Sequence, residues 1–197
     1  MSHLIFDIET YGFLDSVTKT HCLVIKNEEG TVFECNDHGA YRTIEDGLKL
    51  LMNGAANGAK IVGHNIINYD IPVLKKLFPW FDIPQAQVLD TLVLARLIYT
   101  NIKDIDMGLL KKQKLPGRLF GSHSLEAYGY RLGLMKGEYA DEFKKDFIAA
   151  WGEDAWVPGM EWESFSQEMA DYCVQDVEVT EALYLKLLAK DYSPMAI

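Results

Sequence analysis

Two acidic residues near the amino terminus have a spacing that suits metal chemistry. Asp7 and Glu9 lie in the segment HLIFDIET, whose pattern is typical of a β-strand. Side chains two residues apart on a strand project from the same face, so we expect the two carboxylates side by side. Adjacent carboxylates repel each other unless a positive charge lies between them, and a hard divalent cation with oxygen ligands is the usual solution. The pair therefore indicates a metal site, although Asp-x-Glu alone is a common pattern that recurs at Asp176 and Glu178.

Three further residues extend this set because of their order along the chain. Asp70 ends the segment HNIINYD at an expected strand-to-helix junction. Tyr172 and Asp176 are four residues apart on the expected final helix, so they share one face of it. Asp70 can also act simply as a helix cap, and a hydrogen-bonded core residue is the simpler interpretation of Tyr172. The informative feature is the sequence of contexts, which runs from an early strand through a junction to a last helix.

The elements that must position these residues begin with strands. Residues 3–10, 21–25 and 31–35 are expected as three antiparallel strands. Thr43 can cap a helix that follows, and residues 60–63 form a short strand that leads into a helix ended by Pro79. A second strand-to-helix junction lies in VLDTLVLARLIY, and a basic loop comes after it.

Helices make up the remainder of the pattern. We expect one from near Ser122 to Gly133, one from Tyr139 to Trp151, and a last one that opens at Ser164 with Gln167 completing a capping box. Strands followed by alternating strands and helices predict an α/β fold, with a mixed sheet of antiparallel amino-terminal strands flanked by helices.

Length and composition favour an ordinary water-soluble globular protein. The 197 residues suit a single domain, 1–197, with 49% hydrophobic and 24% charged residues. No apolar run is long enough for a membrane span, and no export signal is evident, so no membrane partner is expected. The three cysteines contain no CxxC pair, which argues against a disulfide framework and fits a reducing cytoplasm.

The distribution of charged residues along the chain matters as much as its negative net charge. A net charge of -10 argues at first against nucleic-acid binding. However, residues 103–118 hold five basic and two acidic residues, a balance of +3, whereas residues 137–181 hold 13 acidic and two basic residues, a balance of -11. The basic group Lys111, Lys112, Lys114 and Arg118 either guides a phosphate backbone or is simply solvated.

IFDIET, HNIINYD and YCVQD match, in sequence and in order, the three motifs of a known family. The chain resembles the 3'-5' exonucleases that have four metal-binding acidic residues and a tyrosine, the DEDDy subfamily of DnaQ-like nucleases. It is closer still to the amino-terminal proofreading domains of the family A DNA polymerases of T7-like bacteriophages. This resemblance runs from about Leu4 to Lys190 and includes long stretches outside the motifs, such as KLPGRLFGSHSLEAYGYRLG. It implies a ribonuclease H-like fold, in agreement with the pattern of elements.

The resemblance also implies a role for each motif residue. Asp7 would bridge two divalent ions, Glu9 and Asp176 would complete the first site, and Asp70 would reach the second ion through water. Tyr172 would orient the attacking water. Because every implied ligand is an oxygen, Mg²⁺ is the expected ion and Mn²⁺ a substitute. A sister family has a histidine five residues before the last aspartate, where this chain has Asp171.

Four residues beside these motifs are candidates for substrate binding: Thr10, Phe13, His64 and Asn65. Phe13 can stack on a terminal base, although burial in the core explains it equally well. His64 is more readily explained as a structural hydrogen-bonding residue beside the site. Asp90, at the second junction, is better explained as a helix cap than as a fifth ligand.

The activity that the resemblance implies is removal of nucleotides from single-stranded or frayed 3' ends of DNA, releasing 5'-mononucleotides in phage DNA replication. Two alternatives remain, an RNA-trimming exonuclease and a non-catalytic docking module. In that family the polymerase portion follows soon after the position of Lys190, whereas this sequence stops at Ile197. Three expectations follow: a separately encoded unit that pairs with a polymerase, a unit that acts alone, or an excised domain. Thioredoxin is not implied. A bacterial host cytoplasm is the expected location.

Overall fold

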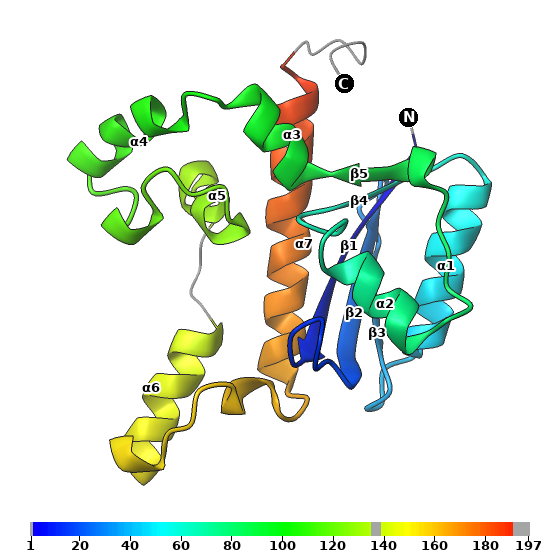
Figure 1. Ribbon diagram of the computed structural model, residues 1–197, viewed down its shortest axis with the longest axis horizontal. Coiled ribbons are helices and arrows are strands. Elements are labelled where there is room, and N and C mark those ends of the chain that lie inside the picture. The colour runs from blue at the N-terminus through cyan, green and yellow to red at the C-terminus, as the bar shows by residue number, and fades with distance from the viewer. Residues whose placement is uncertain (1, 135–138, 191–197) are drawn as a thin grey trace.

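The computed structural model describes residues 2–134 and 139–190, which contain a five-stranded sheet (Figure 1). Its strands are β1 (His3–Tyr11), β2 (Lys19–Asn27), β3 (Val32–Asn36), β4 (Lys60–Gly63) and β5 (Val88–Asp90). They lie in the order β3-β2-β1-β4-β5. β2 pairs antiparallel with β1 and β3, whereas β4 pairs parallel with β1 and β5. The mixed sheet that the sequence predicts is therefore confirmed.

Helices cover both faces of this sheet. α1 (Ile44–Ala56) and α2 (Asp70–Leu77) lie on one face, and the long α7 (Gln167–Leu188) crosses the other (Figure 1). α3 (Thr91–Ile98) follows β5, and α4 (Ile102–Lys111), α5 (Leu125–Leu132) and α6 (Tyr139–Trp151) lie beyond α7, away from the sheet (Figure 1). Within the described ranges, no helix combines the length and apolar character that crossing a bilayer requires.

The central strand β1 is buried from both sides, and its alternation decides where its polar residues point. Phe6 and Ile8 pack in the cluster beneath α1 and α2. Ile5 packs in the cluster formed with α7. Because strand side chains alternate, Asp7 and Glu9 share the side of Ile5 and lie on the α7 face.

The cap and the buried face of two helices follow the sequence pattern. The Thr43 side chain accepts a hydrogen bond from the Asp46 amide, and the Asp46 carboxylate accepts one from the Thr43 amide, which completes a capping box at α1. On α7, the inner face includes five buried apolar residues; these are Met169, Cys173, Val177, Leu183 and Leu187. α6 also ends at Trp151, and Gly152 follows with a φ of 86°.

The predicted start of the last helix is wrong by two residues, because the cap is Ser166 rather than Ser164. The Ser166 side chain accepts the hydrogen bond from the Met169 amide at 3.1 Å. Phe165 explains the later start, because its ring stacks on His38 at a centroid distance of 4.7 Å and joins the cluster under α7. This packing holds the chain in a non-helical conformation until Ser166.

The predicted basic loop after α3 is wrong in part, because residues 103–111 belong to the helix α4, whereas Lys112, Lys114 and Arg118 follow that helix. Ile102 and Asp106 are buried four residues apart, and this spacing gives the helix an inner face that the run of charges obscures. The next helix, α5, begins at Leu125 with Ser124 as its cap, slightly later than the Ser122 start that was expected.

Candidate metal centre and substrate groove

β1 and α7 bring three potential metal ligands together. One ligand atom each of Asp7, Glu9 and Cys173 lies within 4.8 Å of the other two. The Cys173 thiol donates a hydrogen bond to Asp7 Oδ2 at 3.5 Å. The predicted side-by-side position of Asp7 and Glu9 is therefore confirmed, and a β-bulge between Glu9 and Thr10 ends the regular register directly after them.

Asp70 and Asp176 add their charges to this group from two helices. Asp70 is the buried first residue of α2, and its carboxylate accepts a hydrogen bond from the Ile8 backbone amide on β1. Asp176 is half-buried on α7. The negative charges of Asp70 and Asp176 both act on Asp7. Four carboxylates from three elements thus lie near enough to interact electrostatically beside the central strand, and among the described residues those of Asp7 and Glu9 also belong to the group within 4.8 Å.

The loop that leads from β4 to Asp70 depends on close packing at Gly63 and on a left-handed backbone conformation at Asn65. A Cβ atom at Gly63 would collide with Ile66 Cγ2 and lie 3.0 Å from the Phe6 carbonyl oxygen, so this turn accommodates only glycine without rearrangement. Asn65 follows with a φ of 66°, a left-handed conformation that asparagine tolerates well.

Asp90 holds this loop in place and also caps α3. Its carboxylate accepts hydrogen bonds from the Asn65, Ile67 and Leu92 amides at 2.9, 3.1 and 2.8 Å. The preference for a cap over a fifth metal ligand at Asp90 agrees with these bonds. In addition, Asp90 positions the segment that leads into Asp70.

Burial and mutual repulsion make the ionised form of the acidic cluster costly. Burial raises the pKa of Asp7 and Glu9 well above the usual range, and the neighbouring carboxylates raise both further. Burial likewise raises the pKa of Asp70 to about 7. Across the described residues, no lysine, arginine or histidine forms an ion pair with Asp7, Glu9 or Asp70. Carboxylate oxygens that repel one another and have no cationic side chain to neutralise them are suitable ligands for divalent metal ions.

Asp70 is expected to make the stability of the metal-free chain depend on pH. Its pKa is about 7 in the folded chain against an ordinary value of 3.8, so the folded state binds the extra proton and loses stability as pH rises through 7. From about pH 6 to pH 8, the free energy of unfolding should fall by roughly 1 kcal/mol more in the parent than in Asp70→Asn. Urea unfolding in chelator measures both slopes, and equal slopes would contradict this assignment.

Tyr172 and Asp176 lie one turn apart on α7, as predicted. Both are half-buried, and Asp176 acts electrostatically on Asp7 and Glu9. Tyr172 is therefore placed on the same helix face as one of the four carboxylates.

A groove of about 690 Å³ opens beside Glu9, between the β1–β2 turn and the segment 157–163. Thr10, Phe13 and Tyr69 are among its lining residues. Phe13 is 84% exposed, so burial in the core does not explain it. The Tyr69 hydroxyl donates to the Gly12 carbonyl oxygen at 2.9 Å, and it therefore accepts from Thr10 Oγ1, which lies 2.5 Å away.

The segment 157–163 forms the opposite wall and is fastened to β2. Lys19 Nζ donates to the Glu163 carbonyl oxygen at 2.8 Å, and His21 Nε2 donates to the Trp162 carbonyl oxygen at 2.6 Å. Val157 and Trp162 line the groove from this side. These bonds tie a wall of the groove to the same strand pair that carries the acidic residues.

His64 and Asn65 lie at the strand-to-helix junction, but their polar groups are engaged. The ring nitrogens of His64 contact Thr91 Oγ1 and the His123 carbonyl oxygen, each at 2.9 Å. Burial lowers the pKa of His64, which keeps the ring neutral. Asn65 Oδ1 accepts from Asn68 Nδ2 at 3.2 Å. Both residues support the junction in this arrangement.

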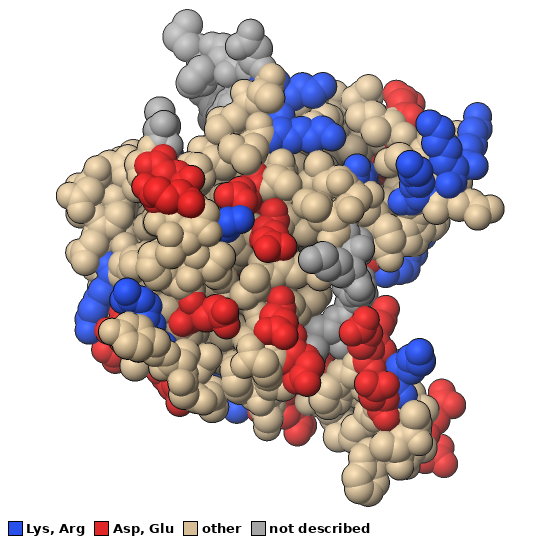
Figure 2. All heavy atoms as spheres, turned by 180° about the vertical axis from the view of Figure 1, so that it is seen from behind, with Lys and Arg blue, Asp and Glu red and all other residues tan. Residues whose placement is uncertain are grey.

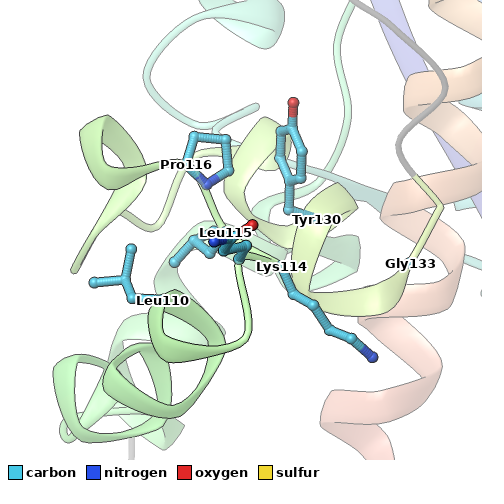
Figure 3. Close-up of a pocket in the computed structure, with 7 residues that line it drawn as sticks. Leu110, Lys114, Leu115, Pro116, Tyr130 and Gly133 are labelled. Carbon is cyan, nitrogen blue, oxygen red and sulfur yellow. The ribbon is translucent and has the colours of Figure 1, made fainter.

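Basic side chains gather over α4, whereas acidic ones follow the region of α6 (Figure 2). Arg118 is not an uncompensated cation, because its two terminal nitrogens, Nη1 and Nη2, donate to the two oxygens of the Glu126 carboxylate. Lys114 lines a hollow of about 660 Å³ between α4 and α5, together with Pro116 and Tyr130 (Figure 3). This hollow shares no lining residue with the groove beside Glu9.

Three features of the site were not anticipated from the sequence. The sequence analysis assigns no role in the site to Cys173, to Tyr69 or to the segment 157–163. Tyr69 directly precedes Asp70, and this adjacency was the one available indication for it. No local spacing connects Cys173 or residues 157–163 with β1.

The mixed sheet, its helices on both faces and the acidic cluster on β1 are features of one class of protein. Residues 4–188 match the family model of the RNase_H superfamily, and the chain belongs to this family. It is 49% identical over 203 residues to the DNA-directed DNA polymerase of Escherichia phage T7, and equally to that of Enterobacteria phage T3. Each match covers 98% of this chain, and the chain spans 28% of each polymerase.

The solved structures agree with the fold. Brucella melitensis NrnC superposes with a TM-score of 0.57 at 17% identity, over 95% of this chain and 72% of that chain. At such low identity the superposition shows a common fold alone. The predicted ribonuclease H-like fold and the resemblance to polymerases of T7-like phages are both confirmed.

Proposed function

We propose that the chain is a metal-dependent 3'-5' exonuclease that removes nucleotides from single-stranded or frayed DNA ends and releases 5'-mononucleotides. The observation that carries this proposal is that the carboxylates of Asp7, Glu9, Asp70 and Asp176 lie near one another beside a groove. Among the described residues, no cationic side chain forms an ion pair with any of the first three. The identity to the phage T7 polymerase over nearly the whole chain supports it.

The proposed cofactors are two divalent ions, Mg²⁺ with Mn²⁺ as a substitute. Asp7 would hold both ions, Glu9 and Asp176 would hold the first, and Asp70 the second. Two ions so bound would activate water on one side of a phosphodiester and would stabilise negative charge on the leaving 3' oxygen on the other. The raised pKa values of Asp7, Glu9 and Asp70 show that their ionised forms are costly, and bound cations would compensate this cost.

Tyr172 is proposed to position the attacking water. A tyrosine with an ordinary pKa near 10 is a poor base at neutral pH, so its hydroxyl orients the water rather than taking its proton. Its position one turn from Asp176 on α7 supports this role.

The groove beside Glu9 is proposed to hold the last nucleotides of the strand. The exposed ring of Phe13 is available to stack on a base, and Thr10 lines the groove next to Glu9. Asn65 and His64 would contribute to substrate binding indirectly, because their bonds shape the junction before Asp70. On a protein with a net charge of -10, such binding should weaken steeply with salt.

In the cell, we propose a role in proofreading during phage DNA replication, in a bacterial host cytoplasm. Residues 1–197 would act as one domain, alongside a separately encoded DNA polymerase where the replication machinery is split. Thioredoxin is not proposed as a partner of these residues. The similarity to polymerases that are much longer than this chain supports a connection with replication.

A 5'-labelled oligonucleotide assay tests the activity. With Mg²⁺ or Mn²⁺ the label should remain on a ladder of products shortened from the 3' end, and chelator should stop the reaction. Faster trimming of a matched RNA strand would favour the RNA-trimming alternative. A chain that binds metal but cleaves neither strand would favour the docking module and contradict the proposal.

Tyr172→Phe tests the role of the tyrosine separately. Loss of one positioning hydroxyl should slow turnover by about 10- to 1,000-fold, while the Mg²⁺ concentration for half-maximal rate stays nearly unchanged. Single-turnover kinetics across a Mg²⁺ series measures both quantities. Tyr130→Phe, on α5 outside the groove, is the matched control. Unchanged turnover in Tyr172→Phe would remove the residue from the mechanism.

A further inference from the structure

Cys173 introduces sulfur into a group of oxygen ligands. Its side chain is completely buried, and its Sγ atom lies 3.5 Å from Asp7 Oδ2. The ligand atoms of Asp7, Glu9 and Cys173 all lie within 4.8 Å of one another, although they come from β1 and α7. Toward a hard ion such as Mg²⁺ the thiol offers little, and it serves instead as a hydrogen-bond donor that orients the Asp7 carboxylate.

A softer ion would use the same three atoms differently. Zn²⁺ and Cd²⁺ accept thiolate and carboxylate ligands in one coordination shell, with Zn–S near 2.3 Å and Zn–O near 2.1 Å. Tetrahedral coordination at these lengths places the ligand atoms about 3.5 Å apart, so small side-chain rotations are sufficient for a group already this close. Water can supply the fourth position.

We propose that Asp7, Glu9 and Cys173 form a site for thiophilic divalent ions, and that occupancy by Zn²⁺ or Cd²⁺ excludes the catalytic metal ions and stops the reaction. On binding, the Cys173 S–H bond breaks, a sulfur–metal bond forms and the proton passes to the solvent, without any change of oxidation state. The binding site rests on the geometry of these three residues, and the inhibition rests on the proposed exonuclease function.

The chain offers a matched control cysteine. Cys35 is as deeply buried as Cys173, but it packs in the cluster beneath α1, on the other face of the sheet from Asp7 and Glu9. Cys22 is unsuitable as a control, because its thiol contacts Cys173. A comparison of Cys173→Ser with Cys35→Ser therefore separates the proposed site from a general effect of buried thiols.

Titration of the metal-free full chain with Cd²⁺ tests the binding, because cadmium–thiolate bonds absorb in the ultraviolet. The parent and Cys35→Ser should develop this absorption with one ion per chain, and Mg²⁺ should compete for it. Cys173→Ser should lose the absorption and bind Cd²⁺ at least about tenfold more weakly by calorimetry. Glu9→Gln should weaken Cd²⁺ binding while keeping the absorption, and it serves as a second variant if Cys173→Ser does not fold.

Absence of the absorption in the parent, or its persistence in Cys173→Ser, would overturn the proposal. Loss of the absorption in Cys35→Ser would do the same. The nuclease assay in Mg²⁺ distinguishes the two hypotheses. Cd²⁺ bound at Cys173 in a chain that cleaves no DNA contradicts only the proposed function, whereas cleavage without the absorption contradicts only the thiophilic site. Inhibition by Zn²⁺ should also be weaker in Cys173→Ser than in Cys35→Ser.

Discussion

The double variant Asp7→Ala with Glu9→Ala should lose nuclease activity by about 10³-fold or more, because the metal ions proposed to bind there would contribute several kcal/mol of transition-state stabilisation. Both carboxylates have raised pKa values in the folded chain, so their removal should relieve repulsion and leave the fold intact. Turnover of 5'-labelled single-stranded DNA measures the first expectation. Thermal unfolding in chelator measures the second, with a midpoint at or above that of the parent.

A charge-matched control for this pair is available on α7. Glu168 and Glu178 are both exposed, and Glu168→Ala with Glu178→Ala removes the same two negative charges without touching β1. This control should degrade DNA at a rate close to that of the parent. A double variant of Asp7 and Glu9 that degrades DNA as fast as the control would end the exonuclease hypothesis.

The largest expected effect on stability lies elsewhere, at a buried ion pair that joins α4 to α5. Arg131 donates through Nε and Nη2 to the two oxygens of Asp106 at 2.9 and 2.8 Å, and Asp106 also accepts from the Gly121 amide at 2.8 Å. The Asp106 side chain is 0% exposed and that of Arg131 is 6% exposed. Asp106→Ala would leave a buried guanidinium without its partner and should cost about 3 to 5 kcal/mol of the free energy of unfolding.

Denaturant unfolding measures this loss against a neighbouring control. Asp104 lies two residues earlier on α4 and is exposed, so Asp104→Ala should change stability by less than about 0.5 kcal/mol. Asp106→Leu combined with Arg131→Met should recover a large part of the loss, since the buried charge is then removed as well. A cost below about 1 kcal/mol for Asp106→Ala would contradict the importance of this pair.

The success and failure of the predictions from sequence have a common physical origin. The side of β1 that carries Asp7 and Glu9, and the shared face of Tyr172 and Asp176, follow from the repeat of a strand and of a helix. The cap at Thr43 is equally local, since it involves residues three apart. Ser166 was missed in favour of Ser164 because the packing of Phe165 on His38, far away along the chain, selects between two adjacent serines.

The helix α4 illustrates the same limit. Its charges indicate a solvated loop when they are read one by one, but the buried pair of Asp106 and Arg131 links two segments 25 residues apart and turns one acidic residue into part of the interior. Burial of a charge becomes favourable only where its partner is brought to it. No spacing within α4 contains that information.

The types of the acidic residues, their order along the chain and the faces from which they project were readable from the printed sequence. The folded chain alone shows that Cys173 donates to Asp7, that Asp90 holds the junction before Asp70, and that the segment 157–163 faces Phe13 across a groove. The difference arises because the geometry of a single strand or helix depends on neighbours a few residues apart. Contacts between distant segments depend on which apolar faces pack together. The packing of α7 on β1 brings Asp176 to Asp7 and Glu9, and the placement of α2 against β1 brings Asp70 to the same strand.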